Sequence, residues 1–274
     1  MKILGAVLTS SDTAGPYAQT RPLAIEELEL AAPGPTEVLV RIEAAGICHS
    51  DLSVVDGSRR RPLPMLLGHE AAGTVLEVGA EVRKLAPGQR VVAAFLPRCG
   101  DCDACATDGR LPCEVGSRSN GAGDLIAGGR RLHGAHGSVA HHLGVSGFAT
   151  HAVLDARSLV AVGRDVPADI AAVLGCAVLT GGGAVLNAGR PKPGQAIAIV
   201  GLGGVGMAAL LVARSLPGVT VVGVDSNSDK VELARELGAD SALTSDEAAS
   251  AGFVADVVIE CAGAARAFEA AVRM

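Results

Sequence analysis

Residues 196–215 decide the fold of the second half of the chain. At their centre stands Gly201-Leu202-Gly203-Gly204-Val205-Gly206. The apolar segment Ala196–Val200 precedes this turn, and Val205–Ser215 follows it with helical spacing and no internal breaker. A Gly-x-Gly-x-x-Gly turn between a strand and a helix is typical of dinucleotide-binding folds. The pattern alone is weak evidence, since a glycine-rich packing turn without a ligand gives it too.

Each glycine of this turn has a separate task in such folds. Gly201 permits the tight turn, Gly203 lets the backbone approach a pyrophosphate, and Gly206 lets helix and strand pack closely. Gly204 and Val205 open the helix, whose first amides would face the phosphates. We therefore expect these residues to bind a dinucleotide.

An acidic residue at the end of the next predicted strand, Val219–Val224, supports this interpretation. Asp225 stands where a carboxylate accepts hydrogen bonds from a ribose diol, and its charge would repel a 2′-phosphate. NAD is therefore expected rather than NADP. Lys230 lies about one helical turn further on and either reaches the ribose or is a solvated surface lysine.

The rest of the second half alternates between strand and helix. A charged helix is predicted over Asp229–Leu237 with Gly238 as its C-cap, then a strand over Asp256–Cys261 and a helix from Ala264 to Arg273. This alternation predicts a doubly wound parallel sheet, the Rossmann architecture.

The first half has a different pattern. Short predicted strands separated by Pro-Gly turn signals indicate an antiparallel, barrel-like domain; they are Val38–Ala44, Ala72–Val78 and Arg90–Phe95. Residues 114–147 are rich in Gly, Ser, Arg and His and are expected to form a long excursion with little regular structure. The histidines in or near it are expected at solvated loop positions, with the alternative that one of them orients a neighbouring residue; they are His133, His136, His141, His142 and His151.

Composition limits the function. The 274 residues are 49% hydrophobic and 19% charged, and the net charge of −6 argues against a nucleic-acid partner. The uncharged stretch Ala196–Ala213 contains the glycine turn, so no membrane span is expected there. Met1–Leu8 is too short for a secretory signal, and a reducing cytoplasm is the expected compartment.

Four of the seven cysteines lie close together, as Cys99, Cys102, Cys105 and Cys113. Four thiolates favour a closed tetrahedral zinc site that stabilises the fold without taking part in chemistry. A disulfide-bonded or vacant loop and an iron–sulfur cluster are the alternatives that the spacing leaves open.

Cys48, His69 and Cys176 form a possible second metal set. Two thiolates and one imidazole would leave a fourth position for water or an alcohol, the ligand set of alcohol dehydrogenases. Their separation in sequence does not bring them together, and a buried cysteine or a core histidine is the alternative for each one.

Four motifs together resemble one family. They are Gly-Ile-Cys-His-Ser-Asp at 46–51, Gly-His-Glu-Ala-Ala-Gly at 68–73, the four-cysteine lobe at 99–113 and the glycine turn at 201–206. In sequence and order they resemble the zinc-containing alcohol dehydrogenases of the medium-chain dehydrogenase/reductase superfamily. The resemblance implies a GroES-like catalytic domain over 1–176 and a Rossmann domain over 177–274, with the active site in the cleft between them.

The resemblance also implies roles for single residues. Cys48, His69 and Cys176 would hold the catalytic zinc, with Glu70 and Asp51 behind them. Ser50 would hydrogen-bond the substrate oxygen and begin a proton relay. Ser53 stands where several relatives have a histidine that passes the proton to solvent, so the resemblance does not extend the relay beyond Ser50. Three further residues would contact the nicotinamide nucleotide or the substrate: His49 the pyrophosphate, Thr180 the nicotinamide and Phe95 the substrate pocket.

The implied activity is oxidation of a small-molecule alcohol to an aldehyde or ketone with two zinc ions per chain and NAD. The sequence His141-His142-Leu143-Gly144 resembles longer-chain relatives, so a thiol-dependent formaldehyde dehydrogenase is an alternative. The family's chains continue beyond the position of Met274. The chain is therefore expected to end inside an incomplete Rossmann domain and to lack the strands that join homo-oligomers, which makes an inactive zinc-binding fragment the third alternative.

Overall fold

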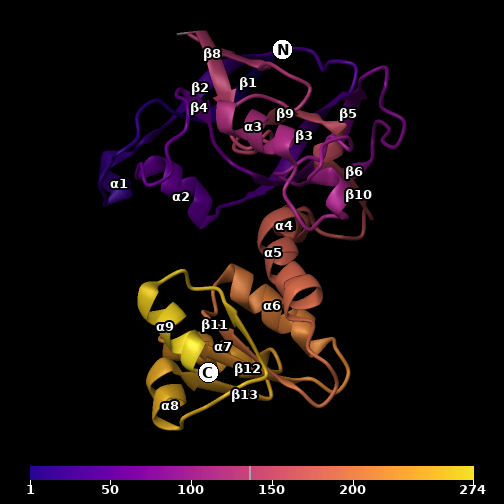
Figure 1. The fold of residues 1–274 in the computed structure, drawn as a ribbon. Coiled ribbons are helices and arrows are strands. Elements are labelled where there is room, and N and C mark those ends of the chain that lie inside the picture. The colour runs from indigo at the N-terminus through magenta and orange to yellow at the C-terminus, as the bar shows by residue number, and fades with distance from the viewer. Residues whose placement is uncertain (136) are drawn as a thin grey trace. The chain divides into compact units, whose positions relative to one another are not determined.

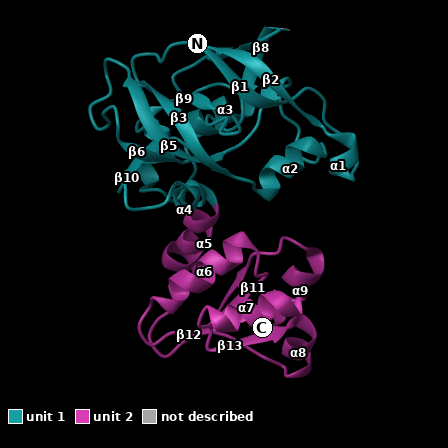
Figure 2. Cartoon of the chain, turned by 180° about the vertical axis from the view of Figure 1, so that it is seen from behind, with its two compact units in different colours: residues 1–176 teal, residues 177–274 magenta. Residues whose placement is uncertain are grey.

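The chain folds into two units. The computed structural model describes residues 1–135 and 137–274, and Figure 2 shows its compact units, Met1–Cys176 and Ala177–Met274. His136, one of the histidines expected in a solvated loop, lies outside the described residues.

A closed barrel and a second sheet make up the first unit. The barrel order is β1-β2-β7-β8-β4, and its strands are β1 (Lys2–Leu8), β2 (Leu23–Leu30), β7 (Leu132–Gly134), β8 (Gly137–His141) and β4 (Met65–Leu66). The second sheet has the order β10-β6-β5-β3-β9, with β10 (Leu159–Val162), β6 (Arg90–Ala93), β5 (Glu70–Val78), β3 (Glu37–Gly46) and β9 (His151–Asp155). Buried aliphatic residues such as Leu28, Leu66 and Val139 fill the barrel.

Helices of the first unit are short and join the strands (Figure 1). They are α1 (Tyr17–Thr20), α2 (His49–Val55), η1 (Cys105–Thr107), α3 (Glu114–Ala122), η2 (Ala156–Ser158) and α4 (Ala168–Val173). The barrel-like domain is thus confirmed, although it is not antiparallel throughout, because β4 pairs in parallel with β8.

The expectation of little regular structure over residues 114–147 is wrong. That segment contains α3, β7 and β8, and the β7–β8 hairpin completes the barrel. The expectation of solvated histidines is also wrong for His141 and His142, which are both buried, whereas His133 is exposed. Short strands rich in Gly and Ser give a weak periodic signal, and their stability comes from pairing with β2 and β4.

The second unit is a parallel sheet covered by helices. Its order is β13-β12-β11-β14, with β11 (Ala196–Val200), β12 (Thr220–Asp225), β13 (Ser241–Thr244) and β14 (Val257–Glu260). The helices are α6 (Gly204–Arg214), α7 (Ser228–Glu236), α8 (Ser245–Ser250) and α9 (Ala265–Arg273). The predicted Rossmann architecture is confirmed, and its strand order reverses between β11 and β14, the position where such sheets bind ligands.

A helical stretch made of α4, η3 (Leu174–Val178), α5 (Leu179–Gly183) and η4 (Ala184–Gly189) follows the first-unit strands. Over Ala168–Gly189 it is long and apolar enough to cross a bilayer, with a mean hydropathy of 1.8, but core helices meet the same criterion. Ala171 and Ala172 are fully buried in a cluster with Ala72, so packing inside the first unit accounts for these two residues of α4, whereas Ile170 of the same helix is exposed. The stretch Ala196–Ala213 divides into β11, the turn and α6, as predicted.

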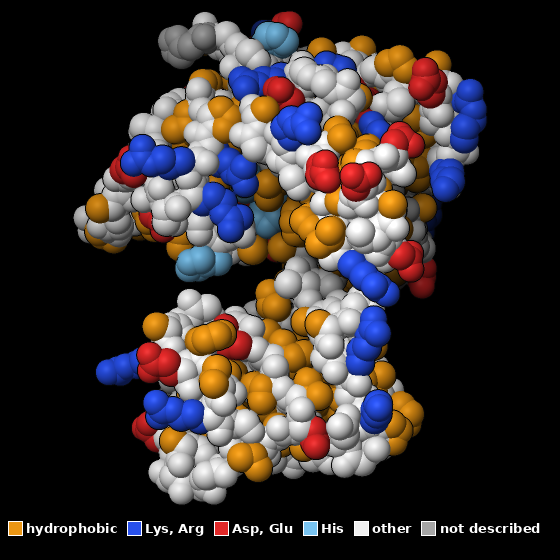
Figure 3. All heavy atoms as spheres, in the orientation of Figure 1, with side chains coloured by type: hydrophobic (Ala, Val, Ile, Leu, Met, Phe, Trp, Pro, Cys, Tyr) orange, Lys and Arg blue, Asp and Glu red, His pale blue; other side chains and the backbone are white. Residues whose placement is uncertain are grey.

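Apolar side chains also reach the surface of the second unit, where Figure 3 shows hydrophobic groups among polar ones. On α9 both Phe268 and Val272 are exposed, on one face of a strongly amphipathic helix. An apolar helix face open to water is typical of a surface that another element covers.

Candidate active site

Three segments far apart in sequence meet at one group of side chains. Cys48 is the N-cap of α2, His69 directly precedes β5, and Cys176 lies in η3. The Sγ atom of Cys176 is 4.0 Å from that of Cys48 and 3.5 Å from Nε2 of His69. A carboxylate oxygen of Glu70 joins them, and the four ligand atoms lie within 4.8 Å of one another.

These separations fit a zinc ion. Tetrahedral zinc with Zn–S bonds of about 2.3 Å and Zn–N bonds of about 2.1 Å places sulfurs about 3.8 Å apart and sulfur and nitrogen about 3.6 Å apart. A disulfide would instead hold the sulfurs about 2.05 Å apart. The donors are two sulfurs and an imidazole, the types that zinc prefers.

The carboxylate of Asp51 holds the imidazole of His69 in place through the ring nitrogen that faces away from the thiols. Its Oδ1 lies 3.1 Å from Nδ1 of His69, which leaves Nε2 facing the two thiols. The same carboxylate accepts the backbone N–H of Cys48 at 3.0 Å and that of Gly68 at 3.2 Å. Burial alone would raise the pKa of Asp51, but its contacts with the imidazoles of His142 and His69 hold the pKa below its usual range. The carboxylate therefore stays charged and fixes the ring of His69.

The two thiols differ in their affinity for protons. A hydrogen bond from Cys176, followed by one from His69, lowers the pKa of Cys48 to about 3. The same contact with Cys48, together with burial, raises the pKa of Cys176. Burial opposes protonation of His69, but its bond to Asp51 raises the pKa of the ring to about 9. These contacts therefore favour the thiolate form of Cys48 and the protonated form of Cys176, and a zinc ion held there would favour deprotonation of both.

Close backbone packing places Cys176. A Cβ added to the preceding residue, Gly175, would lie 1.8 Å from the carbonyl oxygen of Ala93. Only glycine lets this part of the helical stretch approach β6 so closely.

Further predicted residues lie around the metal set. The ring of Phe95 meets that of His69 edge to face, with centroids 5.7 Å apart. Ser50 lies in the first turn of α2, and its backbone N–H helps to lower the pKa of Cys48. His49, beside it, is exposed.

The four-cysteine lobe forms a second thiol group. Cys99 and Cys105 have sulfurs 3.9 Å apart, and so do Cys102 and Cys113, which again fits tetrahedral zinc and not disulfides. Cys113 is fully buried, and N–H groups of Gly116 and Cys99 point at its sulfur. Although burial raises it, these donors bring the pKa of Cys113 down to about 6.

The glycine turn of the second unit has the expected close approaches. Gly201 has a φ of +90°, and a Cβ there would lie 2.5 Å from the backbone nitrogen of Ala262, which follows β14. A Cβ on Gly206 would lie 1.8 Å from the carbonyl oxygen of Gly201. Gly203 caps α6 without any side-chain hydrogen bond, so the first amides of α6 have no competing side chain where a phosphate would bind.

Asp225 lies beneath this turn, at the end of β12. Its Oδ2 accepts the N–H of Leu202 at 2.7 Å and its Oδ1 that of Asn227 at 2.9 Å. Lys230 is 3.8 Å from Oδ2. Each carboxylate oxygen has a second lone pair, so these bonds leave room for a ribose hydroxyl. Thr180 is exposed in α5 of the same unit.

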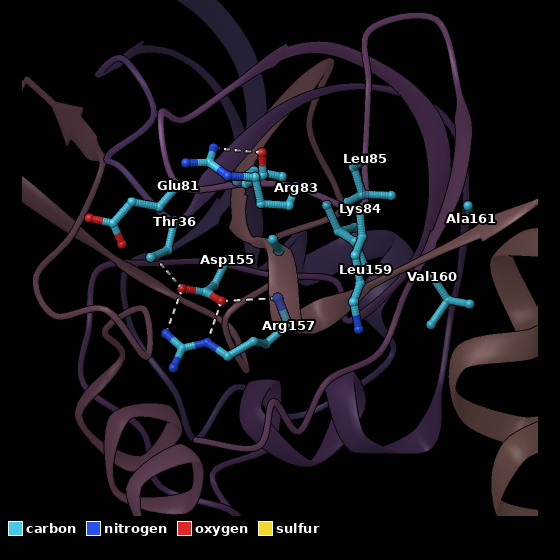
Figure 4. A pocket seen from close by; sticks show the side chains of 12 residues that line it. Thr36, Glu81, Arg83, Lys84, Leu85, Asp155, Arg157, Leu159, Val160 and Ala161 are labelled. Atoms are coloured by element: carbon cyan, nitrogen blue, oxygen red, sulfur yellow. Dashed lines mark hydrogen bonds and ion pairs between the residues drawn. The ribbon is translucent and has the colours of Figure 1, made fainter. Parts of the chain in front are cut away.

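A separate hollow of about 720 Å³ lies in the first unit beside Asp155 (Figure 4). Arg157 and Thr36 bind the two oxygens of Asp155, and Leu85 and Leu159 also line the hollow. Its central acid is fully paired, and none of the predicted site residues lines it.

A barrel unit, a Rossmann unit and two zinc-compatible thiol groups are together typical of zinc-binding dehydrogenases. Two family models match the chain: the alcohol dehydrogenase GroES-like domain over residues 34–164 and the zinc-binding dehydrogenase over residues 204–274. The chain belongs to the zinc-containing alcohol dehydrogenases of the medium-chain dehydrogenase/reductase superfamily.

The chain is similar to several dehydrogenases in sequence and in structure. Geraniol dehydrogenase of Castellaniella defragrans is 43% identical over 224 residues, which are 81% of this chain and 60% of that enzyme. An alcohol dehydrogenase zinc-binding domain protein from Burkholderia ambifaria superposes with a TM-score of 0.89 at 32% identity, over all of this chain and 74% of that one. Benzyl alcohol dehydrogenase from Acinetobacter calcoaceticus gives a TM-score of 0.87 at 29% identity, with the same coverage.

Proposed function

We propose that the protein oxidises alcohols to aldehydes or ketones, using zinc and NAD. The observation that carries the proposal is the meeting of Cys48, His69 and Cys176 at distances that suit one zinc ion. Its membership of the zinc-containing alcohol dehydrogenases supports the reaction type. The acid at the end of β12 supports NAD over NADP.

When bound, zinc supplies a Lewis acid for the alcohol oxygen, and the nicotinamide supplies a hydride acceptor. The residues of the chain bind the metal, orient its histidine ligand and transfer the proton. Cys48, Cys176 and His69 hold the ion and leave one position for substrate, and Asp51 keeps Nε2 of His69 turned toward it. Ser50 would accept the hydroxyl proton while passing its own O–H proton onward, as the first step of a relay to solvent. Glu70, whose carboxylate oxygen lies in the same group, would be able to supply a further ligand atom to the ion.

Apolar unsaturated primary alcohols are the proposed substrates. Two similar proteins are named for geraniol and benzyl alcohol, whose reacting carbons are allylic and benzylic. The edge of Phe95 beside His69 adds an apolar surface next to the metal set.

The proposal is tested by measuring zinc content and NAD reduction on the purified protein. We expect two zinc ions per chain and a higher kcat/KM for geraniol and benzyl alcohol than for ethanol. A single zinc ion, or oxidation of formaldehyde only with added thiol, would contradict the proposal in its metal count or its substrate.

Asp225→Gly is expected to weaken NAD binding and Asp225→Asn to relax discrimination against NADP, each by about 10- to 100-fold, the range for a charged hydrogen bond. Asparagine retains an acceptor for the N–H of Leu202 and removes only the charge, so it separates repulsion of the 2′-phosphate from support of the turn. The measurement is KM for both cofactors, with Asp229→Ala, an exposed acid on α7, as the matched control. A parent protein that already prefers NADP would refute this role of Asp225.

A further inference from the structure

A second buried imidazole lies against the carboxylate that supports the zinc ligand. His142 follows β8 and is 1% exposed. Its Nδ1 lies 3.1 Å from Oδ1 of Asp51, and its ring meets that of His69 edge to face, with centroids 5.2 Å apart. Asp51 Oδ1 therefore has two imidazoles and the N–H of Gly68 around it.

The backbone holds His142 in this place. Its N–H donates to Oγ of Ser146 at 3.1 Å, and that hydroxyl donates to the carbonyl of Leu66, next to the His69 segment. The following residue, Leu143, has a φ of +53°, a conformation that a leucine rarely adopts. Within residues 1–135 and 137–274, Nδ1 of His142 has no other polar partner and meets Asp51 with poor hydrogen-bond alignment. Buried polar atoms in folded proteins nearly always have a hydrogen-bond partner, so a buried nitrogen whose one polar neighbour is Asp51 needs an explanation.

We propose that His142 is a positioning residue for the metal site. It restrains the Asp51 carboxylate through the contact at Oδ1, so that Oδ1 continues to face Nδ1 of His69 and Nε2 remains directed at the proposed ion. The inference rests on the proposed function, because it assumes that zinc binds at Cys48, His69 and Cys176.

The adjacent residue offers a matched control. His141 is as buried as His142, but its Nε2 accepts the N–H of Arg131 at 3.0 Å and its Nδ1 faces Ser146. Removing either ring takes an imidazole from the interior, whereas only His142 touches Asp51. A general loss of packing therefore affects both variants, and a positioning effect only one.

The experiment measures release of zinc from the holoenzyme to a chromogenic chelator. Zinc should leave the two sites in separate kinetic phases. The phase that is absent in Cys48→Ala is assigned to the site of Cys48, His69 and Cys176. We expect His142→Leu to weaken zinc binding there about tenfold, at the lower end of the range for groups behind a metal ligand, and His141→Leu to leave it unchanged. Equal effects of the two substitutions would overturn the proposal.

Two further variants keep the proposal testable if His142→Leu does not fold. His142→Asn places an amide nitrogen where Nδ1 stood, and His142→Gln places it nearer Nε2, so only asparagine should retain zinc affinity. In an Asp51→Asn background the His142 substitution should add little, because both act through one carboxylate. If the two substitutions weakened zinc binding independently, so that their effects multiplied, His142 would not act through Asp51. If Cys48→Ala released zinc with the same kinetic phases as the parent protein, the proposed function itself would be refuted.

Discussion

Replacing Cys48 by alanine is expected to remove one zinc ion per chain and to lower kcat by about a thousandfold or more. The physical reason is that a Lewis acid supplies several kcal/mol of transition-state stabilisation, and each 1.4 kcal/mol or so corresponds to tenfold in rate. Metal analysis and steady-state kinetics on the same preparation measure both effects. The four-cysteine lobe should keep its ion, because its sulfurs form a separate group.

Cys261 provides the matched control for this substitution. It is a partly buried thiol just after β14 that packs against the core of the second unit, and its thiol faces the carbonyl of Ile259. Cys261→Ala should leave both zinc ions and turnover in place. If Cys48→Ala retained two zinc ions and full activity, the metal assignment would be wrong.

Cys113→Ala is expected to destabilise the lobe rather than to stop the chemistry directly. Its sulfur is fully buried, accepts two backbone N–H groups and caps α3. Structural zinc contributes roughly 10–16 kcal/mol to folding of small zinc peptides, so we expect a loss of at least about 3 kcal/mol here. Thermal unfolding and limited proteolysis within residues 99–113 measure it.

Asp101→Ala is the control within the same loop, since this carboxylate is exposed. It should change stability by less than about 0.5 kcal/mol. An equal effect of Cys113→Ala and Asp101→Ala would indicate that the lobe holds no stabilising ion.

The local parts of this molecule could be predicted from its sequence. The glycine turn, β11 and α6 follow from a pattern in which each residue has a backbone task, and Gly201 and Gly206 do make the close approaches expected. The alternation of strand and helix on either side of the glycine turn correctly predicted a parallel sheet. In the second unit β13 and α8 were missed, because a four-residue strand followed at once by a helix is too short for a periodic signal, and so were α5 and η4 before β11.

Long-range contacts could not be predicted in the same way. Resemblance, and not spacing, linked Cys48, His69 and Cys176. The burial of His142 was missed because a histidine in a Gly-rich segment has no apolar periodicity that places it inside. Its contact with Asp51 depends on the β7–β8 hairpin, whose stability comes from pairing with distant strands.

The arrangement around Asp51 has a consequence for how the metal site is filled. One anion joins the backbone before α2 to the backbone before β5, through the amides of Cys48 and Gly68. Two of the three ligand-bearing segments are thus aligned in advance, and little conformational entropy remains to be lost when the ion arrives. At the proposed zinc site, such preorganisation favours tight binding of the ion.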